Sequence, residues 1–167
     1  MILAFDSYYF DGKAKTVCLE FENWIDTDNF NVYSEVLEQV AEYVPGEFYK
    51  RELPCILSLL SKINIEDVSA IIVDGYVFLD DDGKLGLGGH LYEATGRRWP
   101  VIGVAKSNFM TVNKLKALVY RGNSNDPLFI TSIGTNAEIA AAQIKNMSGK
   151  FRMPMLLKKL DQLTKQL

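Results

Sequence analysis

Residues 2–21, ILAFDSYYFDGKAKTVCLEF, contain the clearest signals for secondary structure in the chain. It opens as an apolar strand, and Asp11-Gly12 is a strong signal for a hairpin turn, because such turns need positive φ at both central residues. Residues 14–21 then alternate between apolar and polar, which is typical of a strand with one buried face. We therefore expect an antiparallel hairpin here. Residues 32–42 fit both helix and strand spacing, and a third strand of the same meander is the preferred interpretation.

The rest of the chain alternates between strand and helix patterns. Apolar runs predict strands at 68–73, 101–105, 115–120 and 128–132. Helices are expected from Pro54, which suits a first turn, over 85–96, over 136–147 with Ile139, Ala140 and Ile144 inward, and from Pro154 to the end. A meander followed by alternating elements predicts an α/β domain with a mixed sheet. We expect residues 1–167 to form a single domain, since no linker or repeat divides them.

Composition excludes several classes of protein. The 167 residues are 48% hydrophobic and 23% charged, which is ordinary for a globular domain and unlike disordered, collagen-like or coiled-coil chains. No apolar run is long enough for a membrane helix, and Asp6 comes too early for a signal peptide. Cys18 and Cys55 fit buried free thiols, so we expect a reducing, cytoplasmic setting. With His90 as the only histidine, a His-rich zinc site is excluded.

The net charge of −3 conceals an uneven distribution. Residues 1–83 hold 17 acidic and 5 basic residues, whereas residues 84–167 hold 4 acidic and 13 basic residues. Such a division calls for an explanation, and we suggest contacts between the basic half and a phosphate backbone. The candidates for contact with a phosphate backbone are Lys106, Lys114, Lys116, Arg121, Lys145, Lys150 and Arg152. We expect positive potential to gather on one face.

Two acidic residues stand where strands are central or end. Asp6 lies within an apolar strand and Asp74 ends another, and a carboxylate in such a place needs a partner or a metal ion. Glu52 is the third candidate. Three carboxylates can hold one or two Mg²⁺ ions that act on a phosphodiester. From spacing alone, Asp74-Gly75 is equally well explained as a strand-ending turn.

Eight short segments resemble motifs of the endonuclease V family and follow the family's order. They are Asp6-Ser7-Tyr8, Tyr43-Val44-Pro45-Gly46, Lys50-Arg51-Glu52, Val73-Asp74-Gly75, Gly86 to His90, Pro100 to Ser107, Pro127 to Ile130 and Gly149 to Pro154. The segment that contains Lys106 is the most specific. Together they cover nearly the whole chain.

The resemblance implies a ribonuclease H-like fold and a Mg²⁺-dependent endonuclease, with Mn²⁺ as an alternative ion. Its partner would be inosine-containing DNA, or RNA, cut at the second phosphodiester 3′ of the lesion to leave 3′-hydroxyl and 5′-phosphate ends, in DNA repair. By position, Asp6, Glu52 and Asp74 would be the catalytic and metal-binding carboxylates, and Lys106 a catalytic cation near the phosphate. We expect a monomer with no membrane partner.

The resemblance also implies a substrate-binding set. Tyr43, Val44, Pro45 and Gly46 would form a wedge that fills the stack when a base is flipped out, and an aromatic side chain on a stiff loop suits that role. Gly75 and His90 would belong to the same set. For His90, the simpler interpretation is a helix histidine satisfied by its neighbours.

The chain departs from the family pattern at two histidines. Phe78 to Asp82 replaces a His-Pro-Arg stretch, and Gly134-Thr135 replaces a Gly-His pair. Asp80 is a candidate replacement ligand. Two other hypotheses therefore stand beside an active nuclease with altered metal use. One is a homologue that binds nucleic acid without cutting it, and the other is a small-molecule phosphoesterase on the same fold.

Overall fold

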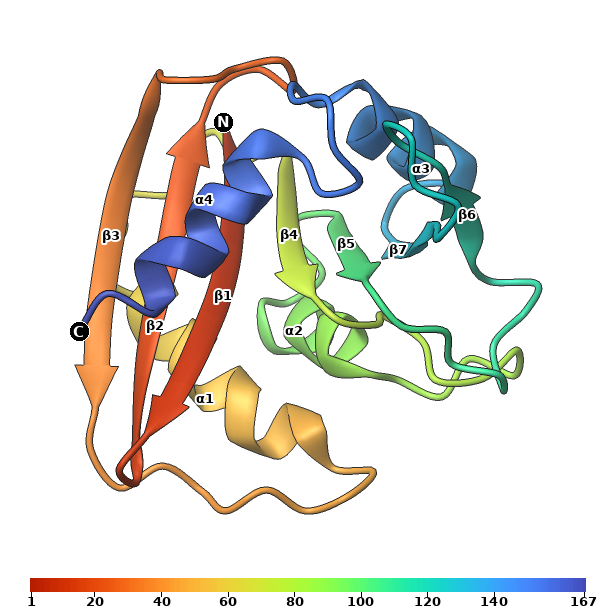
Figure 1. Ribbon diagram of the computed structural model, residues 1–167. Helices are drawn as coiled ribbons and strands as arrows, with labels where there is room; N and C mark the ends of the chain where they lie inside the picture. Colours follow the sequence, from red (N-terminus) through yellow and green to blue (C-terminus); the bar gives the residue numbers. More distant parts are fainter.

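The computed structural model describes all 167 residues, and its seven strands form one sheet (Figure 1). The strands are β1 (Ile2–Phe10), β2 (Lys13–Phe21), β3 (Phe30–Leu37), β4 (Ala70–Asp74), β5 (Val101–Ala105), β6 (Ala117–Val119) and β7 (Leu128–Ile133). The helices are α1 (Phe48–Leu60), α2 (Leu87–Ala94), α3 (Ala137–Asn146) and α4 (Met155–Thr164). None of these helices has the length and apolar character needed to cross a bilayer.

The sheet is mixed, as the sequence predicts. Its order is β3-β2-β1-β4-β5-β7-β6. β1, β4 and β5 are parallel neighbours, and the other pairings are antiparallel. The predicted hairpin joins β1 to β2, with positive φ at both Asp11 and Gly12. The third meander strand is also present, although β3 ends at Leu37, five residues before the predicted limit.

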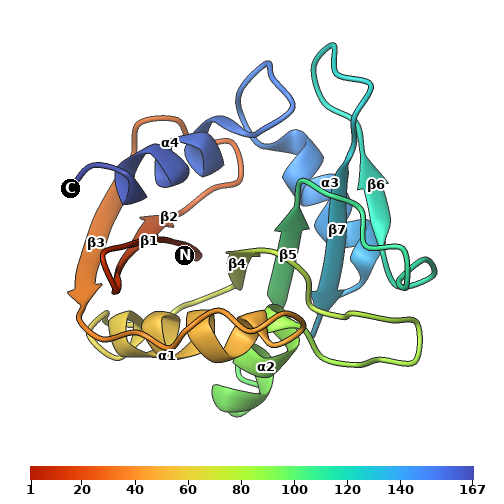
Figure 2. The ribbon, with the colours of Figure 1, turned by 60° about the horizontal axis from the view of Figure 1, so that its bottom comes forward.

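Helices cover both faces of the sheet (Figure 2). One face packs against α3 and α4 around residues such as Ala4 and Ile72. The opposite face packs against α1 and α2 around Phe5 and Val73. Since side chains alternate along a strand, each central strand contributes apolar side chains to both buried layers. Its apolar run is therefore continuous rather than alternating.

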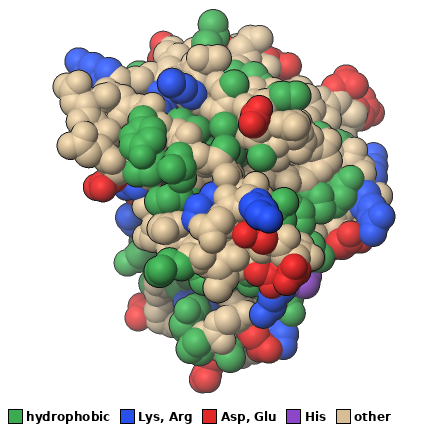
Figure 3. Space-filling view, turned by 90° about the vertical axis from the view of Figure 1, so that its right-hand side faces the viewer, with side chains coloured by type: hydrophobic (Ala, Val, Ile, Leu, Met, Phe, Trp, Pro, Cys, Tyr) green, Lys and Arg blue, Asp and Glu red, His purple; other side chains and the backbone are tan.

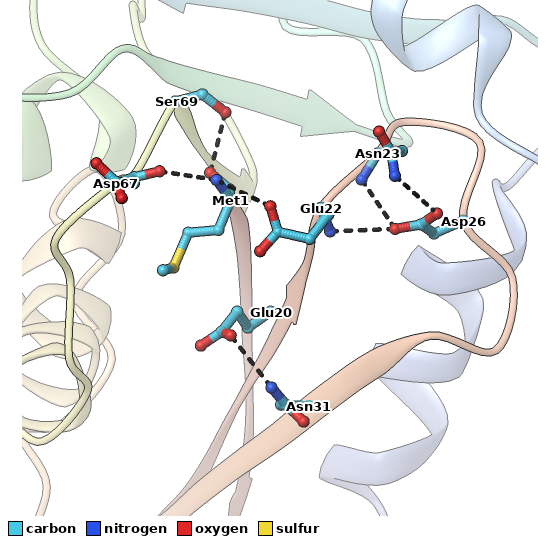
Figure 4. Close-up of polar contacts among 8 residues, drawn as sticks. All are labelled: Met1, Glu20, Glu22, Asn23, Asp26, Asn31, Asp67 and Ser69. Atoms are coloured by element: carbon cyan, nitrogen blue, oxygen red, sulfur yellow. Dashed lines mark hydrogen bonds and ion pairs between the residues drawn. The ribbon is translucent and has the colours of Figure 1, made fainter.

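Polar contacts fix the start of β1 beside the residues that lead into β4 (Figure 4). The Met1 amino group donates to the Asp67 carbonyl at 2.7 Å, and the Ser69 hydroxyl donates to the Met1 carbonyl at 2.9 Å. After β2, the Asp26 carboxylate accepts from the backbone N–H of Glu22 at 3.1 Å and holds the turn toward β3. These contacts reinforce the β1–β4 register that the site requires.

Two expectations about the helices are wrong. Pro54 lies inside α1 rather than in its first turn, because the helix begins at Phe48. Pro54 is on the exposed side, where the carbonyl that loses its N–H partner can be hydrated, while Glu52, Cys55 and Ile56 are buried. In α3, Ala140 and Ile144 are inward as predicted, but Ile139 is exposed. The other predicted helices and strands are present with boundaries shifted by a few residues.

A close backbone approach sets the turn after β4. The Gly75 N–H donates to the Val104 carbonyl at 3.0 Å. A Cβ on Gly103 would lie 2.5 Å from the Gly75 carbonyl oxygen and 2.9 Å from Thr131 Oγ1. Only glycine at position 103 therefore lets β5 support the turn that carries Asp74.

We predict that Gly103→Ala lowers the free energy of unfolding by about 1–3 kcal/mol, as overpacking of a closed site does. Chemical denaturation measures this change. Gly12→Asn is the matched control: the site has open space and a φ of +73°, which Asn tolerates, so we expect a cost of less than about 1 kcal/mol. Equal losses in the two variants would contradict the packing argument.

Candidate active site

Asp6, Asp74 and Lys106 point to the same side of the sheet. Each lies two residues beyond a strand residue that packs in the α3–α4 layer, and side chains two apart in a strand share a face. β1, β4 and β5 are adjacent, with Phe5 opposite Val73. The three side chains therefore meet where β4 and β5 end, which is the edge at which open α/β sheets place ligands.

These three residues line one pocket together with a fourth charged side chain, Asp161 of α4. The pocket has a volume of about 30 Å³, and apolar side chains such as Phe5 and Leu157 form the rest of its wall. That volume holds about one or two waters and suits an ion better than a substrate.

Asp161 is a site residue that the sequence analysis missed. The buried positions of α4 are Leu156, Leu157, Leu160 and Thr164, so an acid directly after Leu160 and four residues after Leu157 falls at the border of the apolar face. This position at the border of the apolar face was the signal in the sequence that could have identified Asp161. The Asp161 carboxylate also forms an ion pair with Lys165 at 2.9 Å.

Two carboxylates of this pocket, those of Asp6 and Asp74, have raised pKa values. The pKa of Asp6 is raised to about 7, first by burial and then by repulsion from Asp74 and Asp161. Burial also raises the pKa of Asp74, because protein surrounds the carboxylate even though part of the side chain stays exposed. Lys106 acts in the opposite direction on both acids. A cation bound between the two acids would relieve the same repulsion.

Glu52 reaches the site from the other layer. It lies on α1, is 6% exposed, and does not line the pocket. Its pKa is raised to about 7 by burial and by the charges of Asp6 and Asp74, so the three acids are electrostatic neighbours. The adjacent Arg51 guanidinium stacks 3.4 Å above the Tyr9 ring and anchors this turn of α1 to β1.

The donor set fits a divalent cation by its chemistry. Asp6 and Asp74 offer carboxylate oxygens, the ligands that Mg²⁺ prefers, in a partly dry pocket where burial opposes their ionisation. Glu52 and Asp161 are the nearest further acids. As the side chains stand, no three His, Cys, Asp or Glu groups are close enough to surround one ion. Binding by all the acids would thus require side-chain movement.

The predicted wedge is an exposed turn before α1. Tyr43 is 56% exposed and Val44 is 47% exposed. The Glu47 N–H donates to the Val44 carbonyl at 3.0 Å, and Gly46 has a φ of +80°. Beside this turn, on the α1–α2 side of Gly75, a pocket of about 220 Å³ has mostly apolar walls: Tyr43, Gly46, Phe48, Tyr49, Gly75, Tyr76, Leu79, Gly86, Leu87 and Phe109.

His90 lies away from the acids, on α2. Its ring stacks on Tyr49 of α1 with a centroid distance of 3.7 Å and an interplanar angle of 19°. Burial lowers the pKa of His90, which favours the neutral imidazole. The contact joins α2 to the first turn of the helix that carries Glu52, as the simpler interpretation of His90 expects.

Neither Asp80 nor Thr135, which stand where the family pattern has histidines, lines the acid pocket. Asp80 is occupied as a turn residue, since its carboxylate accepts from the backbone N–H of Lys84 at 2.9 Å. Thr135 follows β7, whose last residue Ile133 pairs with Val101 at the start of β5. Thr135 is therefore at the edge of the sheet opposite to Asp74.

Not every basic residue of the second half is free to contact a phosphate backbone. On the side shown in Figure 3, Lys and Arg side chains are interspersed with Asp and Glu. Arg121 is 6% exposed and donates to backbone carbonyls, including those of Met147, Gly149 and Phe151, so it cannot contact phosphate. Arg152 likewise donates to the carbonyl of Lys106 at 2.6 Å.

The sequence model of one protein family, described as endonuclease V, matches residues 1–162. The chain belongs to the endonuclease V family. No curated protein matches it by sequence.

Solved structures of this family share the fold. Endonuclease V from Streptomyces avermitilis is 22% identical, with a TM-score of 0.74 over 99% of this chain and 79% of that one. Endonuclease V from Ciona intestinalis, in complex with DNA containing an inosine followed by a ribo-adenosine, is 17% identical, with a TM-score of 0.78 over 99% and 84%. Marinitoga piezophila Argonaute, bound to guide RNA and target DNA, is 10% identical, with a TM-score of 0.58 over 99% and 29%. The fold is ribonuclease H-like, as the resemblance implied.

The raised pKa of Asp6 predicts a pH-dependent stability in EDTA. Its pKa moves from 3.8 to about 7 on folding, so the folded state holds the proton more tightly than the unfolded state. The contribution of Asp6 to stability should be fully present below about pH 4 and be lost as the pH rises through about 7.

Asp6→Asn should remove much of this fall and raise stability at pH 8 by about 1–3 kcal/mol, since one pKa unit is worth about 1.4 kcal/mol. Chemical denaturation at pH 5 and pH 8 measures the difference. Asp126→Asn, at an exposed loop residue, is the control and should leave the profile of the wild type unchanged. If the stability of Asp6→Asn fell with pH as steeply as that of the wild type, the electrostatic explanation would be contradicted.

Proposed function

We propose that the protein is a Mg²⁺-dependent endonuclease that acts on inosine-containing DNA, or RNA, in repair, and cuts the second phosphodiester 3′ of the lesion. Membership of the endonuclease V family supports this function. The observation that carries it is the convergence of Asp6, Asp74, Lys106 and Asp161 on one small pocket at the sheet edge.

The chain's own residues have separable roles in this proposal. Asp6 and Asp74, with Glu52 as the next acid, would hold Mg²⁺ and orient the scissile phosphate. When bound, the ion supplies charge neutralisation and a more acidic water. Lys106, exposed at the mouth of the pocket, would stabilise the charge that develops on the phosphate.

The 220 Å³ pocket is where the flipped base would bind. Two loops that line it are fixed to each other: the Tyr76 hydroxyl donates to the Ser107 carbonyl at 2.6 Å and accepts from the Phe109 N–H at 3.0 Å. Apolar walls and backbone at Gly75 suit a planar base, and Tyr43 stands at the rim to fill the vacated stack.

A second function, binding without cleavage, is favoured by one observation. No three acidic or other metal-ligating side chains already surround an ion position. A homologue in which they never close would bind inosine-containing strands with salt-dependent affinity and release them uncut.

The decisive assay uses an oligonucleotide with a single inosine, incubated with Mg²⁺ or Mn²⁺. We expect one break, one linkage beyond the phosphodiester adjacent to the inosine. Asp6→Ala should reduce cleavage by at least about 10³-fold, because a carboxylate ligand is lost, while binding stays within about 3-fold. Binding without any break would favour the second function, and turnover of a soluble phosphoester without retention of DNA would favour a small-molecule phosphoesterase.

Tyr43→Ala tests the wedge. We expect it to weaken binding of an inosine-containing duplex by about 10-fold, because stacking of a base on an aromatic ring is worth about 1–3 kcal/mol. Tyr43→Phe should keep the affinity. Tyr120→Ala, another exposed tyrosine, is the control. Equal affinities for Tyr43→Ala and the wild type, measured by fluorescence anisotropy, would remove the wedge from the proposal.

A further inference from the structure

Two neighbouring hollows adjoin the acid pocket near the start of α4, and together they are called the groove below. A pocket of about 240 Å³ shares Lys106, Met153 and Asp161 with the acid pocket. A larger pocket of about 520 Å³ shares Phe151, Met153 and Lys158 with that one. The three hollows are therefore neighbours that share wall residues. They lie on the α3–α4 side of the sheet, whereas the proposed base pocket lies on the α1–α2 side.

The groove is lined by cations that have no acidic partner. Lys150, Lys158 and Lys159 line the larger hollow, and none of them forms an ion pair. Asp161 is the one acid along the groove, and Lys165 pairs with it. The surface is therefore complementary to a polyanion, because these lysines are not neutralised by acidic residues of the protein.

Exposed apolar side chains stand between these cations. Phe151 is 63% exposed and Met155 is 45% exposed, although a protein normally buries side chains of this size. Lys158 Nζ lies 5.6 Å from the centre of the Phe151 ring. An aromatic ring between lysines is the combination that binds single-stranded nucleic acid, through base stacking and phosphate neutralisation.

Buried Arg121 holds Phe151 in this exposed position. Its Nη1 donates to the Phe151 carbonyl at 2.6 Å and its Nη2 to the Gly149 carbonyl at 3.1 Å. Gly149 has a φ of +111°, and a Cβ there would lie 2.9 Å from the Met155 backbone nitrogen. The loop is thus fixed from beneath, and the ring is displayed without a large ordering cost on binding.

We propose that this groove binds the single strand on the 3′ side of the cut, with Phe151 stacking on a base and the lysines contacting phosphates. The direction rests on the proposed function: a strand whose altered base occupies the 220 Å³ pocket, and which is cut to the 3′ side of it, crosses the acid pocket and continues into the groove. Arg121 is a positioning residue for this site.

The test is binding of single-stranded oligonucleotides to the whole protein in EDTA, measured by fluorescence anisotropy. One oligonucleotide ends about two nucleotides after the scissile bond and a second ends about ten after it, and a third carries the extra length on the 5′ side. We expect the 3′ extension to tighten binding by about 10-fold or more. An equal gain from the 5′ extension, or no gain from the 3′ one, overturns the proposal.

Substitutions test which residues of the groove contact the single strand. Phe151→Ala should lose about 5- to 10-fold of the gain, and Phe151→Tyr should keep it. Lys158→Ala/Lys159→Ala should lower the slope of log affinity against log salt by about 1.4, which corresponds to two phosphate contacts with a single strand. Lys13→Ala/Lys62→Ala, at distant lysines, is the control and should leave the slope unchanged. Thermal unfolding verifies that each variant is folded.

The outcomes separate the two proposals. If the protein does not cut at inosine with Mg²⁺ but the 3′ extension still acts through Phe151, the proposed function fails and the strand-binding groove stands. If cleavage occurs but the groove variants bind the long strand as the wild type does, the groove proposal fails alone.

Discussion

The site depends on the burial of the Asp6 carboxylate beside that of Asp74. Parallel pairing of β1 and β4, with Phe5 opposite Val73, leaves the two carboxylates on the same face at the end of β4. A protein built only for stability would not place two acids in a partly dry pocket. The surrounding elements tolerate this arrangement because two buried layers hold the strands in register.

The elements around Asp6 and Asp74 contribute to the site in different ways. Gly103 lets the backbone after β4 approach β5, so that Asp74 ends its strand in a fixed turn. Glu52 adds a third charge from α1, and Asp161 adds a fourth from α4. Helices on opposite faces of the sheet thus contribute acids to the same edge, so the site depends on the docking of both layers.

Much of the fold was predictable because its signals are local. Asp11-Gly12 fixes the hairpin, and apolar runs mark the central strands. The place of Pro54 inside α1 was not predictable locally, because burial of one helix face outweighs a lost hydrogen bond on the exposed side. Asp6, Asp74 and Lys106 were predictable from strand ends and motif order. Asp161 and Phe151 were not, since their roles arise only when α4 and its preceding loop pack against the sheet.

The buried positive charge of Arg121 affects the electrostatic field at the loop before α4. Its guanidinium is buried and bound to carbonyl groups only, with no acidic side chain in an ion pair with it. Carbonyl dipoles stabilise a positive charge but do not cancel it, and salt screens a buried charge far less than an exposed one. The loop before α4 therefore carries a permanent source of positive field beneath its surface. At short range that field favours an anion at the surface of this loop, while steering from a distance still weakens as ionic strength rises.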